Sequence, residues 1–389
     1  MIPENQKKIC QNQIQQKRVW MVDTTLRDGE QAPGVVFSTQ DRQEIARGLA
    51  DCGIDEIEAG IPAMGEMACQ DIKGLARLGL PCTLTSWCRA KKADICLAAD
   101  CNTPGVHLSL PTSSILLKTF DRDETWALDT LEELVVFSKR YFDHISVGAQ
   151  DATRTEKRFL TRFARLAHDC GVHRLRLADT VGMASPVMVM EMVSDLLTAL
   201  PGLSLEFHGH NDLGMATANA VSAVDAGAQA LSVTVNGLGE RAGNAPLEET
   251  AMALFGVGPH KGNIQLSGLT RLCRRVAQLS GQTLPPSKPV VGSRIFSHES
   301  GIHCAGLLKD ASSYQLFDPT LVGNQASQFV IGYHSGSAGI RYLLKTQGIS
   351  LSKKEAQQLL PLIRQRALEQ RKELSVSELE QLHRGLQNV

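Results

Sequence analysis

The stretch Val19-Trp20-Met21-Val22-Asp23-Thr24-Thr25-Leu26-Arg27-Asp28-Gly29 joins a short apolar, β-prone run to a polar exit. A doubly wound open sheet would place a glycine-rich G-x-G-x-x-G turn directly after its first strand. This exit has no such turn, so the stretch argues against the open sheet.

Beyond this stretch, seven further apolar runs alternate with longer amphipathic stretches, which is the pattern of repeated βα units. The expected strands are residues 19–24, 56–59, 82–87, 105–110, 144–148, 174–178, 203–208 and 230–235. The clearest helical candidates are residues 40–52, 123–141, 156–170, 186–200 and 216–226. Eight parallel strands with crossover helices predict an α/β fold, a closed (β/α)8 TIM barrel.

The chain divides into three expected regions. Residues 1–18 are rich in Gln, Asn and Lys and are expected to form a disordered tail, and residues 19–262 form the catalytic barrel. Residues 263–389 form C-terminal subdomains, a linker and a helical region, after glycine and proline interrupt the βα rhythm. We expect this mostly helical extension to serve as a dimer contact and a lid.

Composition restricts the partners. The 389 residues carry 40 basic and 41 acidic side chains, and no basic run is long enough to follow a nucleic acid backbone. The N-terminal residues lack the apolar stretch of a signal peptide or a membrane span. Ten cysteines without a C-x-x-C pair indicate reduced thiols. We therefore expect a cytoplasmic protein that binds neither nucleic acid nor membrane.

Polar side chains follow two of the expected strands. His208 and His210 share one face of the seventh strand, and Asp28 lies after the first. The C-terminal ends of barrel strands meet at one rim, so these three can form a site for a divalent metal. The alternative for the two histidines is a hydrogen-bonded surface pair.

Two further features belong to this rim. Arg27 could stabilise an alkoxide that develops beside the metal, or it could form a salt bridge with Asp28 or Glu30. The loop 236–244 is dense in glycine and ends in Asn244, which could reach the metal directly or through water. A charged pair among these glycines is unusual for a purely structural turn.

Together these segments resemble the acyl-CoA-condensing metallolyases, the TIM barrel family of 2-isopropylmalate, citramalate and homocitrate synthases. The resemblance spans about residues 19 to 348 and is carried by residues 23–31, 178–182, 208–212, 237–244 and 297–303. Within the family, residues 60–66, 87–89, 108–111 and 234–241 are most similar to homocitrate synthases associated with nitrogen fixation. Roughly 130 residues after Asn263 leave little room for a leucine-binding regulatory domain.

The resemblance implies an acyltransferase that condenses acetyl-CoA with 2-oxoglutarate and hydrolyses the thioester to homocitrate and CoA, supplying nitrogenase cofactor synthesis. The alternative is a 2-isopropylmalate or citramalate synthase acting on 2-oxoisovalerate or pyruvate. The implied cofactor is a divalent ion, Mg, Mn, Zn, Co or Fe, and the implied assembly is a homodimer. The family's proton-transfer histidine and its tyrosine usually come from the partner subunit.

Residue by residue, the resemblance implies three sets. The metal ligands are Asp28, His208, His210 and Asn244. The catalytic residues are Arg27, His303 and Tyr314. The implied substrate-binding residue is Thr180, to which we add Gln31, Glu58, Arg89 and Arg176 as candidates of our own.

Some positions depart from the family pattern. Gln150 replaces a glutamate after the fifth strand, and His107 replaces an acidic residue, without an assigned role for either. Ser146 stands where lysine-pathway homocitrate synthases have an arginine for the distal carboxylate of 2-oxoglutarate. We expect Arg176 or Arg89 to bind that carboxylate, the alternative for Arg176 being an ion pair with Glu206.

Two other classes of protein compete with the synthases. A lyase of the hydroxymethylglutaryl-CoA type would carry a catalytic cysteine in the glycine loop, where this chain has Glu240 and Arg241. A metal-binding barrel used only for interaction would not need Arg27, His303 and Tyr314 together.

Overall fold

The computed structural model describes residues 18–387, which form two compact units divided between Leu284 and Pro285. The tail expected over residues 1–18 lies, apart from Arg18, outside the described residues. The division lies inside the C-terminal region expected over residues 263–389. The boundary expected at residue 262, between the catalytic barrel and the C-terminal subdomains, stays a prediction.

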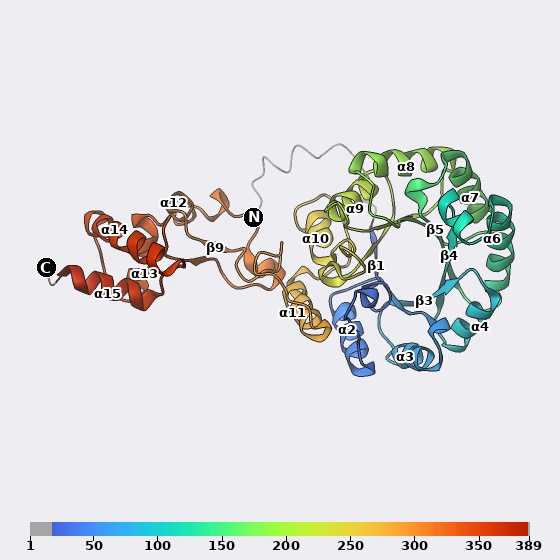
Figure 1. Cartoon of the computed structure of the whole chain (residues 1–389), viewed down its shortest axis with the longest axis horizontal. Helices are drawn as coiled ribbons and strands as arrows, with labels where there is room; N and C mark the ends of the chain where they lie inside the picture. The colour runs from blue at the N-terminus through green and yellow to red at the C-terminus, as the bar shows by residue number, and fades with distance from the viewer. Residues whose placement is uncertain (1–17, 388–389) are drawn as a thin grey trace. The chain divides into compact units, whose positions relative to one another are not determined.

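The first unit is a closed barrel of eight parallel strands paired in chain order (Figure 1). The strands are β1 (Trp20–Asp23), β2 (Glu56–Gly60), β3 (Thr83–Arg89), β4 (Gly105–Pro111), β5 (His144–Gln150), β6 (Arg174–Asp179), β7 (Leu205–Gly209) and β8 (Ala230–Val233). Strand β8 closes the barrel by pairing with β1, with Trp20 opposite Ala230. The predicted TIM barrel is confirmed.

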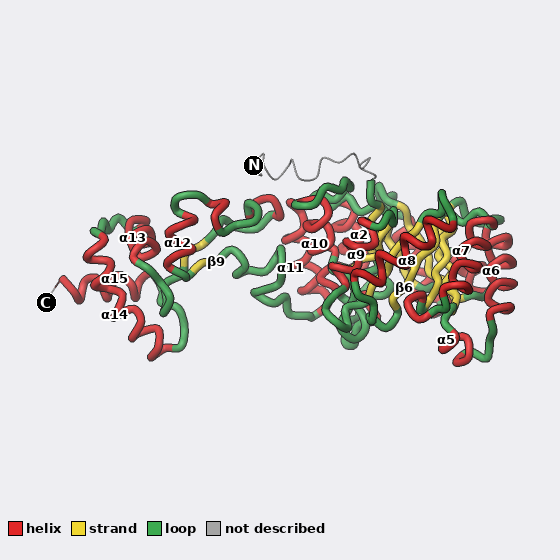
Figure 2. Tube along the Cα trace, turned by 90° about the horizontal axis from the view of Figure 1, so that it is seen from above, coloured by secondary structure: helices red, strands yellow, loops and turns green. Residues whose placement is uncertain are grey.

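Helices surround the strands, as Figure 2 shows. They are α2 (Thr39–Asp51), α3 (Glu66–Ala76), α4 (Lys92–Asp100), α5 (Ser114–Thr119), α6 (Glu124–Ser138), α7 (Lys157–Asp169), α8 (Pro186–Ala199) and α9 (Ala216–Asp225), followed by α10 (Leu247–Ala251) and α11 (Leu269–Ser280). Helix α2 begins at a capping box between Ser38 and Asp41. After it, Gly53 adopts a left-handed φ of 78°, which lets the chain turn into the next strand.

The strands present different side chains to their two faces because side chains alternate along a strand. Apolar side chains such as Ile57, Leu175 and Phe207 are buried on the outer face, where the helices pack. Their neighbours in sequence, Glu56, Glu58, Arg174, Arg176 and Glu206, are equally buried. The barrel interior is therefore ionic, and polar side chains continue up to the rim where the strands end.

The second unit is mostly helical, which confirms the expected C-terminal helical region. It contains β9 (Ser297–His298), β10 (Gln328–Phe329), α12 (Gly301–Leu307), α13 (Ser337–Thr346), α14 (Lys353–Gln370) and α15 (Val376–Gln387). Helices α13, α14 and α15 share an apolar core that includes Ile340, Leu359 and Leu379. Helix α14 ends at Arg371, which adopts a left-handed φ of 52°.

The search for membrane spans covered the described helices, and none of them combines the length and apolarity needed to cross a bilayer.

Candidate active site

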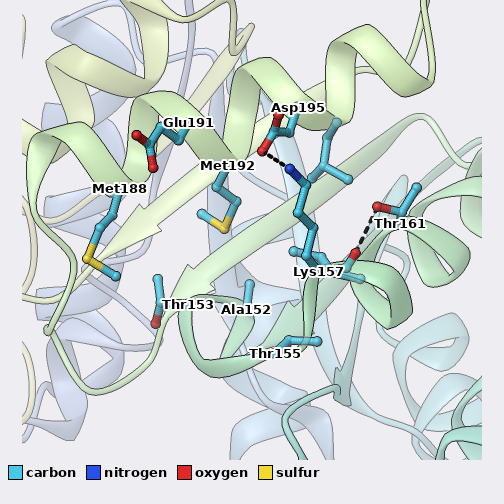
Figure 3. A pocket seen from close by; sticks show the side chains of 11 residues that line it. Ala152, Thr153, Thr155, Lys157, Thr161, Met188, Glu191, Met192 and Asp195 are labelled. Carbon is cyan, nitrogen blue, oxygen red and sulfur yellow. Dashed lines mark hydrogen bonds and ion pairs between the residues drawn. The ribbon is translucent and has the colours of Figure 1, made fainter.

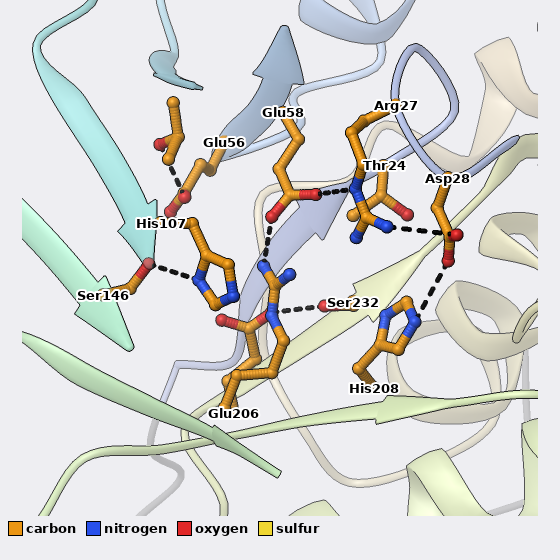
Figure 4. Close-up of polar contacts among 12 residues, drawn as sticks. Thr24, Arg27, Asp28, Glu56, Glu58, His107, Ser146, Glu206, His208 and Ser232 are labelled. Carbon is orange, nitrogen blue, oxygen red and sulfur yellow. Dashed lines mark hydrogen bonds and ion pairs between the residues drawn. The ribbon is translucent and has the colours of Figure 1, made fainter. Parts of the chain in front are cut away.

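Asp28, His208 and His210 converge at the C-terminal ends of β1 and β7. Their ligand atoms all lie within 4.8 Å of one another, and all three residues are buried. The Nε2 atoms of His208 and His210 lie 3.1 Å and 3.9 Å from Asp28 Oδ2. Figure 4 shows the Asp28 carboxylate and the His208 ring facing each other. The backbone of Asn244 forms a bridge with that of His210, so the fourth predicted ligand is a direct neighbour.

The charges at this site suit a metal. Burial alone would raise the pKa of the Asp28 carboxyl, but Arg27 and the two histidines outweigh it and hold this pKa far below its ordinary value. Burial, with the neighbouring His208, lowers the pKa of His210 to about 4. At neutral pH the carboxyl is ionised and His210 is neutral, which are the protonation states that bind a divalent ion.

Buried polar atoms without hydrogen-bond partners at this site indicate whether the residues suit a divalent ion. Within the described chain, His208 Nδ1, His210 Nδ1 and Asn244 Oδ1 are buried and have no hydrogen-bond partner. Asn244 is held by its other side-chain atom, since Nδ2 donates to the Leu238 carbonyl at 2.9 Å. Buried polar atoms are nearly always bonded, so a cation and its water ligands would complete this set.

Arg27 is fixed beside the trio. Its Nη1 lies 3.0 Å from Asp28 Oδ1, and its Nε donates to Glu58 Oε2 at 2.6 Å. The guanidinium also lies over the Trp87 ring, 5.7 Å from the ring centroid. The salt bridge to Asp28 that was one alternative is thus present, and it places the positive charge directly at the site.

Below Arg27 an ion-pair network fills the barrel (Figure 4). Arg176 lies 2.6 Å from both Glu58 Oε1 and Glu206 Oε1. Arg174 in turn pairs with Glu206 at 2.5 Å and with Glu56 at 2.8 Å. Burial would raise the pKa of Glu58 and of Glu206, but the arginines outweigh it and lower each pKa to about 2. Arg27 therefore rests on a continuous network of buried ion pairs.

His107 occupies the same interior. Its Nδ1 lies 2.9 Å from the Ser146 hydroxyl oxygen, so the ring is hydrogen-bonded inside the barrel. Burial and the nearby charge of Arg176 lower its pKa well below the ordinary value. His107, at a position where relatives tend to have an acidic residue, therefore carries no charge at neutral pH.

Three other predicted residues lie elsewhere on the rim. Thr180 follows β6, and its hydroxyl oxygen accepts a hydrogen bond from the Asp151 backbone at 2.8 Å. Gln31 is exposed and lines a groove together with Arg27. Arg89 ends β3, is 53% exposed, and pairs with Asp94 at 2.8 Å.

The two remaining catalytic candidates belong to the second unit. The rings of His303 and Tyr314 stack with centroids 4.2 Å apart, and both side chains are exposed. Their action on the barrel site stays a prediction.

Two of the hollows in the described part of the barrel unit lie among the helices and loops around the strands. The groove beside Arg27 exposes apolar side chains, with Val36, Met64 and Met67 each more than 70% exposed. A second pocket lies between α7 and α8 and is crossed by the ion pair of Lys157 with Asp195, 2.6 Å long (Figure 3). That pocket is lined by none of the predicted site residues, so the groove is the hollow that concerns the site.

Sequence reasoning gave no role to Arg241 or Asp212, although both lie in segments that it quoted. Arg241 Nε donates to Asp212 Oδ1 at 2.8 Å on the same rim. The available signal was the placement of a charged residue among glycines.

The fold and the buried trio define a TIM barrel with a candidate metal centre at the C-terminal ends of its strands. A family model described as HMGL-like matches residues 18–276, and one described as homocitrate synthase post-HMGL domain-like matches residues 290–372. The chain therefore belongs to the HMGL-like family, on the branch with the 2-isopropylmalate and homocitrate synthases.

Individual relatives differ in their names. The chain is 44% identical to 2-isopropylmalate synthase 2 of Caldanaerobacter subterraneus subsp. tengcongensis, over 94% of this chain and 95% of the relative. It is 42% identical to homocitrate synthase of Frankia alni, over 84% of this chain and 93% of the relative. Hydroxymethylglutaryl-CoA lyase of Pseudomonas aeruginosa has the same fold, with a TM-score of 0.62 at 17% identity over 69% of this chain and 94% of the lyase.

Proposed function

We propose that the protein condenses acetyl-CoA with a 2-oxo acid and hydrolyses the thioester, with 2-oxoglutarate as the 2-oxo acid and homocitrate as the product. The observation that carries the proposal is the buried trio of Asp28, His208 and His210 with Arg27 in contact. Relatives named homocitrate synthase, from Nostoc and Frankia, support the choice of product. A role in nitrogenase cofactor synthesis rests on the sequence resemblance alone.

The residues divide the chemistry between them. A divalent ion bound at the trio would polarise the 2-oxo carbonyl as a Lewis acid. Arg27 donates hydrogen bonds toward the oxygen that becomes negative when the carbonyl is attacked, and Glu58 keeps its guanidinium in place. Thr180 has a free hydroxyl proton for the substrate carboxylate, because its oxygen accepts from Asp151. His303, with Tyr314 stacked on it, takes the proton from the acetyl methyl group.

The groove beside Arg27 suits the second substrate. Its exposed apolar side chains offer a surface for the uncharged arm of CoA, next to Arg27, where the acetyl end would meet the 2-oxo carbonyl. The distal phosphates of CoA have no assigned partner among the described residues.

Ion pairing favours Arg89 over Arg176 for the distal carboxylate of 2-oxoglutarate. Arg176 already touches two carboxylates and is 3% exposed, so a third carboxylate would have to displace one of them. Arg89 has a single partner, Asp94, and stands half exposed at the end of β3. An exposed pair is worth little, so exchange of Asp94 for a substrate carboxylate costs little free energy.

The test is a CoA-release assay with 2-oxoglutarate and 2-oxoisovalerate, with mass identification of each product. Arg89→Ala should raise the KM for 2-oxoglutarate about 10-fold or more, the size of one charge-assisted hydrogen bond. The KM for 2-oxoisovalerate, which lacks a distal carboxylate, should stay unchanged. Arg89→Lys should recover part of the affinity, and an equal effect on both acids would contradict this role of Arg89.

The second candidate is a synthase for 2-oxoisovalerate. Two observations favour it, the relative at 44% identity named 2-isopropylmalate synthase and the uncharged pair of His107 and Ser146 inside the barrel. Higher kcat/KM for 2-oxoisovalerate than for 2-oxoglutarate in the wild-type protein would replace the first candidate by this one.

A further inference from the structure

Arg241 joins three loops at the barrel rim. It lies in the loop after β8, and its Nε and Nη2 donate to the two carboxylate oxygens of Asp212, after β7, at 2.8 Å and 3.0 Å. The same Nη2 donates to the Thr180 carbonyl, after β6, at 2.9 Å. Two-point pairing of a guanidinium with a carboxylate fixes both distance and orientation. Three consecutive βα loops are thus tied by one side chain.

The backbone at Arg241 adopts a conformation that is unfavourable for an arginine. Arg241 has a left-handed φ of 55°, a conformation that is uncommon and unfavourable for a residue with a Cβ. Its neighbours Gly239 and Gly243 adopt positive φ values as glycines. A glycine would be unstrained at this position but could not make the guanidinium contacts.

The partner loops meet without space between them. A Cβ added at Gly182 would collide with the Asp212 carboxylate, so this carboxylate packs directly on the backbone after β6. Asp212 is 25% exposed and Arg241 is 41% exposed, so the pair covers the rim instead of the barrel interior. The contact is a clamp between loops.

The two loops that Arg241 connects, after β6 and after β8, each contain a residue of the candidate site. Thr180, whose carbonyl accepts from Arg241, is the candidate contact for the substrate carboxylate. Asn244, three residues after Arg241, has a buried Oδ1 that no described residue bonds, and its backbone bridges to that of His210. The position of the glycine loop therefore decides where both groups point.

We propose that Arg241, paired with Asp212, is a positioning residue that couples the carboxylate contact at Thr180 to the metal shell at Asn244. This proposal rests on the proposed function and deepens it. Arg241 is not among the proposed metal ligands or substrate contacts, and it acts by holding the loops after β6 and β8 in register through Asp212 and the Thr180 carbonyl. Loss of the clamp should weaken binding of the metal and of the 2-oxo acid together.

The test measures two dissociation constants by calorimetry on the full-length protein, one for Mn²⁺ alone and one for 2-oxoglutarate added to Mn²⁺-loaded protein. Arg241→Ala should raise both about 10-fold, the lower end of what loss of an outer-shell partner costs. Arg241→Lys can make one of the contacts but not all three, so its constants should lie between those of wild type and Arg241→Ala. Asp212→Asn should change both constants in the same direction.

The matched control is Arg162→Ala. Arg162 is also an exposed arginine in an ion pair, with Glu124 at 3.2 Å, and it lies on α7 away from the rim. Its constants should equal those of the wild-type protein.

Two results would overturn the proposal. Constants within twofold of wild type in Arg241→Ala would do so, and a lowered melting temperature with unchanged constants would show a merely structural role. Binding of Mn²⁺ can be measured without catalysis, so the positioning role of Arg241 and the proposed function can be contradicted independently of each other. If the wild-type protein binds Mn²⁺ but releases no CoA with any 2-oxo acid, the proposed function is wrong. The Mn²⁺ dissociation constants of the Arg241 variants would still test the positioning role of Arg241.

Discussion

At the scale of single residues, the site depends on an ionised carboxylate held among cations and imidazoles. Asp28 contacts Arg27 at 3.0 Å and His208 at 3.1 Å, and its pKa lies far below the ordinary range. Removing this carboxylate leaves two imidazoles and no anionic ligand in the trio, while Arg27 keeps its ion pair with Glu58. A divalent cation then loses the only negatively charged group among its three candidate ligands.

We therefore predict that Asp28→Asn weakens binding of Mn²⁺ by more than the roughly 100-fold that outer-shell changes reach. Dialysis of the wild-type protein against a chelator should abolish CoA release, and added Mn²⁺ should restore it. Calorimetric titration with Mn²⁺ measures the affinity. Asp129→Asn, an exposed carboxylate on α6, is the control and should bind Mn²⁺ as wild type does. Equal affinity in both variants would remove Asp28 from the metal shell.

At the scale of the elements, the barrel was predictable because each βα unit carries its signal in contiguous sequence. The strand expected over residues 174–178 is observed as Arg174–Asp179, and the other strands agree to within two residues at each end. The metal trio was predictable for the same reason, since strand ends in a parallel barrel meet at one rim. Period-two counting along neighbouring strands also identified the pair of Arg176 with Glu206 as one of two alternatives.

The interior network was only partly predictable, because two of its pairs, Arg174 with Glu56 and Arg176 with Glu58, join β6 to β2, which are distant in sequence and are not neighbours in the barrel. Arg174 bonds Glu56 across 118 positions, and no local pattern links these two residues. Glu58, expected only as a substrate contact, lies between Arg27 and Arg176. Such partners are determined by barrel closure and side-chain length, which the alternation of residues does not specify.

This network leads to a prediction about stability and pH. Glu206 bonds two buried arginines, so Glu206→Gln leaves both with too little negative charge and should lower the free energy of unfolding by about 3–5 kcal/mol at pH 7. Urea denaturation measures this free energy. The control Glu124→Gln, in an exposed pair with Arg162, should change it by about 1 kcal/mol or less.

The pH dependence follows from the lowered pKa of Glu206, about 2 in the folded chain against an ordinary value of 4.5. A carboxyl with a depressed pKa stabilises the folded state above pH 4.5, and this stabilisation is lost as the pH falls toward 2. The difference in unfolding free energy between wild type and Glu206→Gln should therefore shrink from pH 5 to pH 3. A difference that stays constant over this range would show that Glu206 acts through packing and not through charge.

At the scale of the whole molecule, the proposed reaction needs groups from both units. Arg27 belongs to the barrel, whereas His303 and Tyr314 belong to the unit after Pro285. The sequence resemblance implies a homodimer in which the second unit of one chain serves the barrel of the other. In that arrangement each site combines residues of two chains, so one chain can supply what the other lacks.

Mixed dimers of Arg27→Ala and His303→Ala chains test this arrangement. Each parent homodimer should be nearly inactive, because both of its sites lack one group. A mixed dimer has one site with both defects and one site with neither, so its CoA release should reach about half of the wild-type rate per dimer, since the two sites of a symmetric dimer are equivalent. Co-expression with two different tags and purification through both isolates the mixed dimer, and light scattering confirms two chains. A mixed dimer as inactive as its parents would show that His303 serves the barrel of its own chain, because every site would then carry one defect.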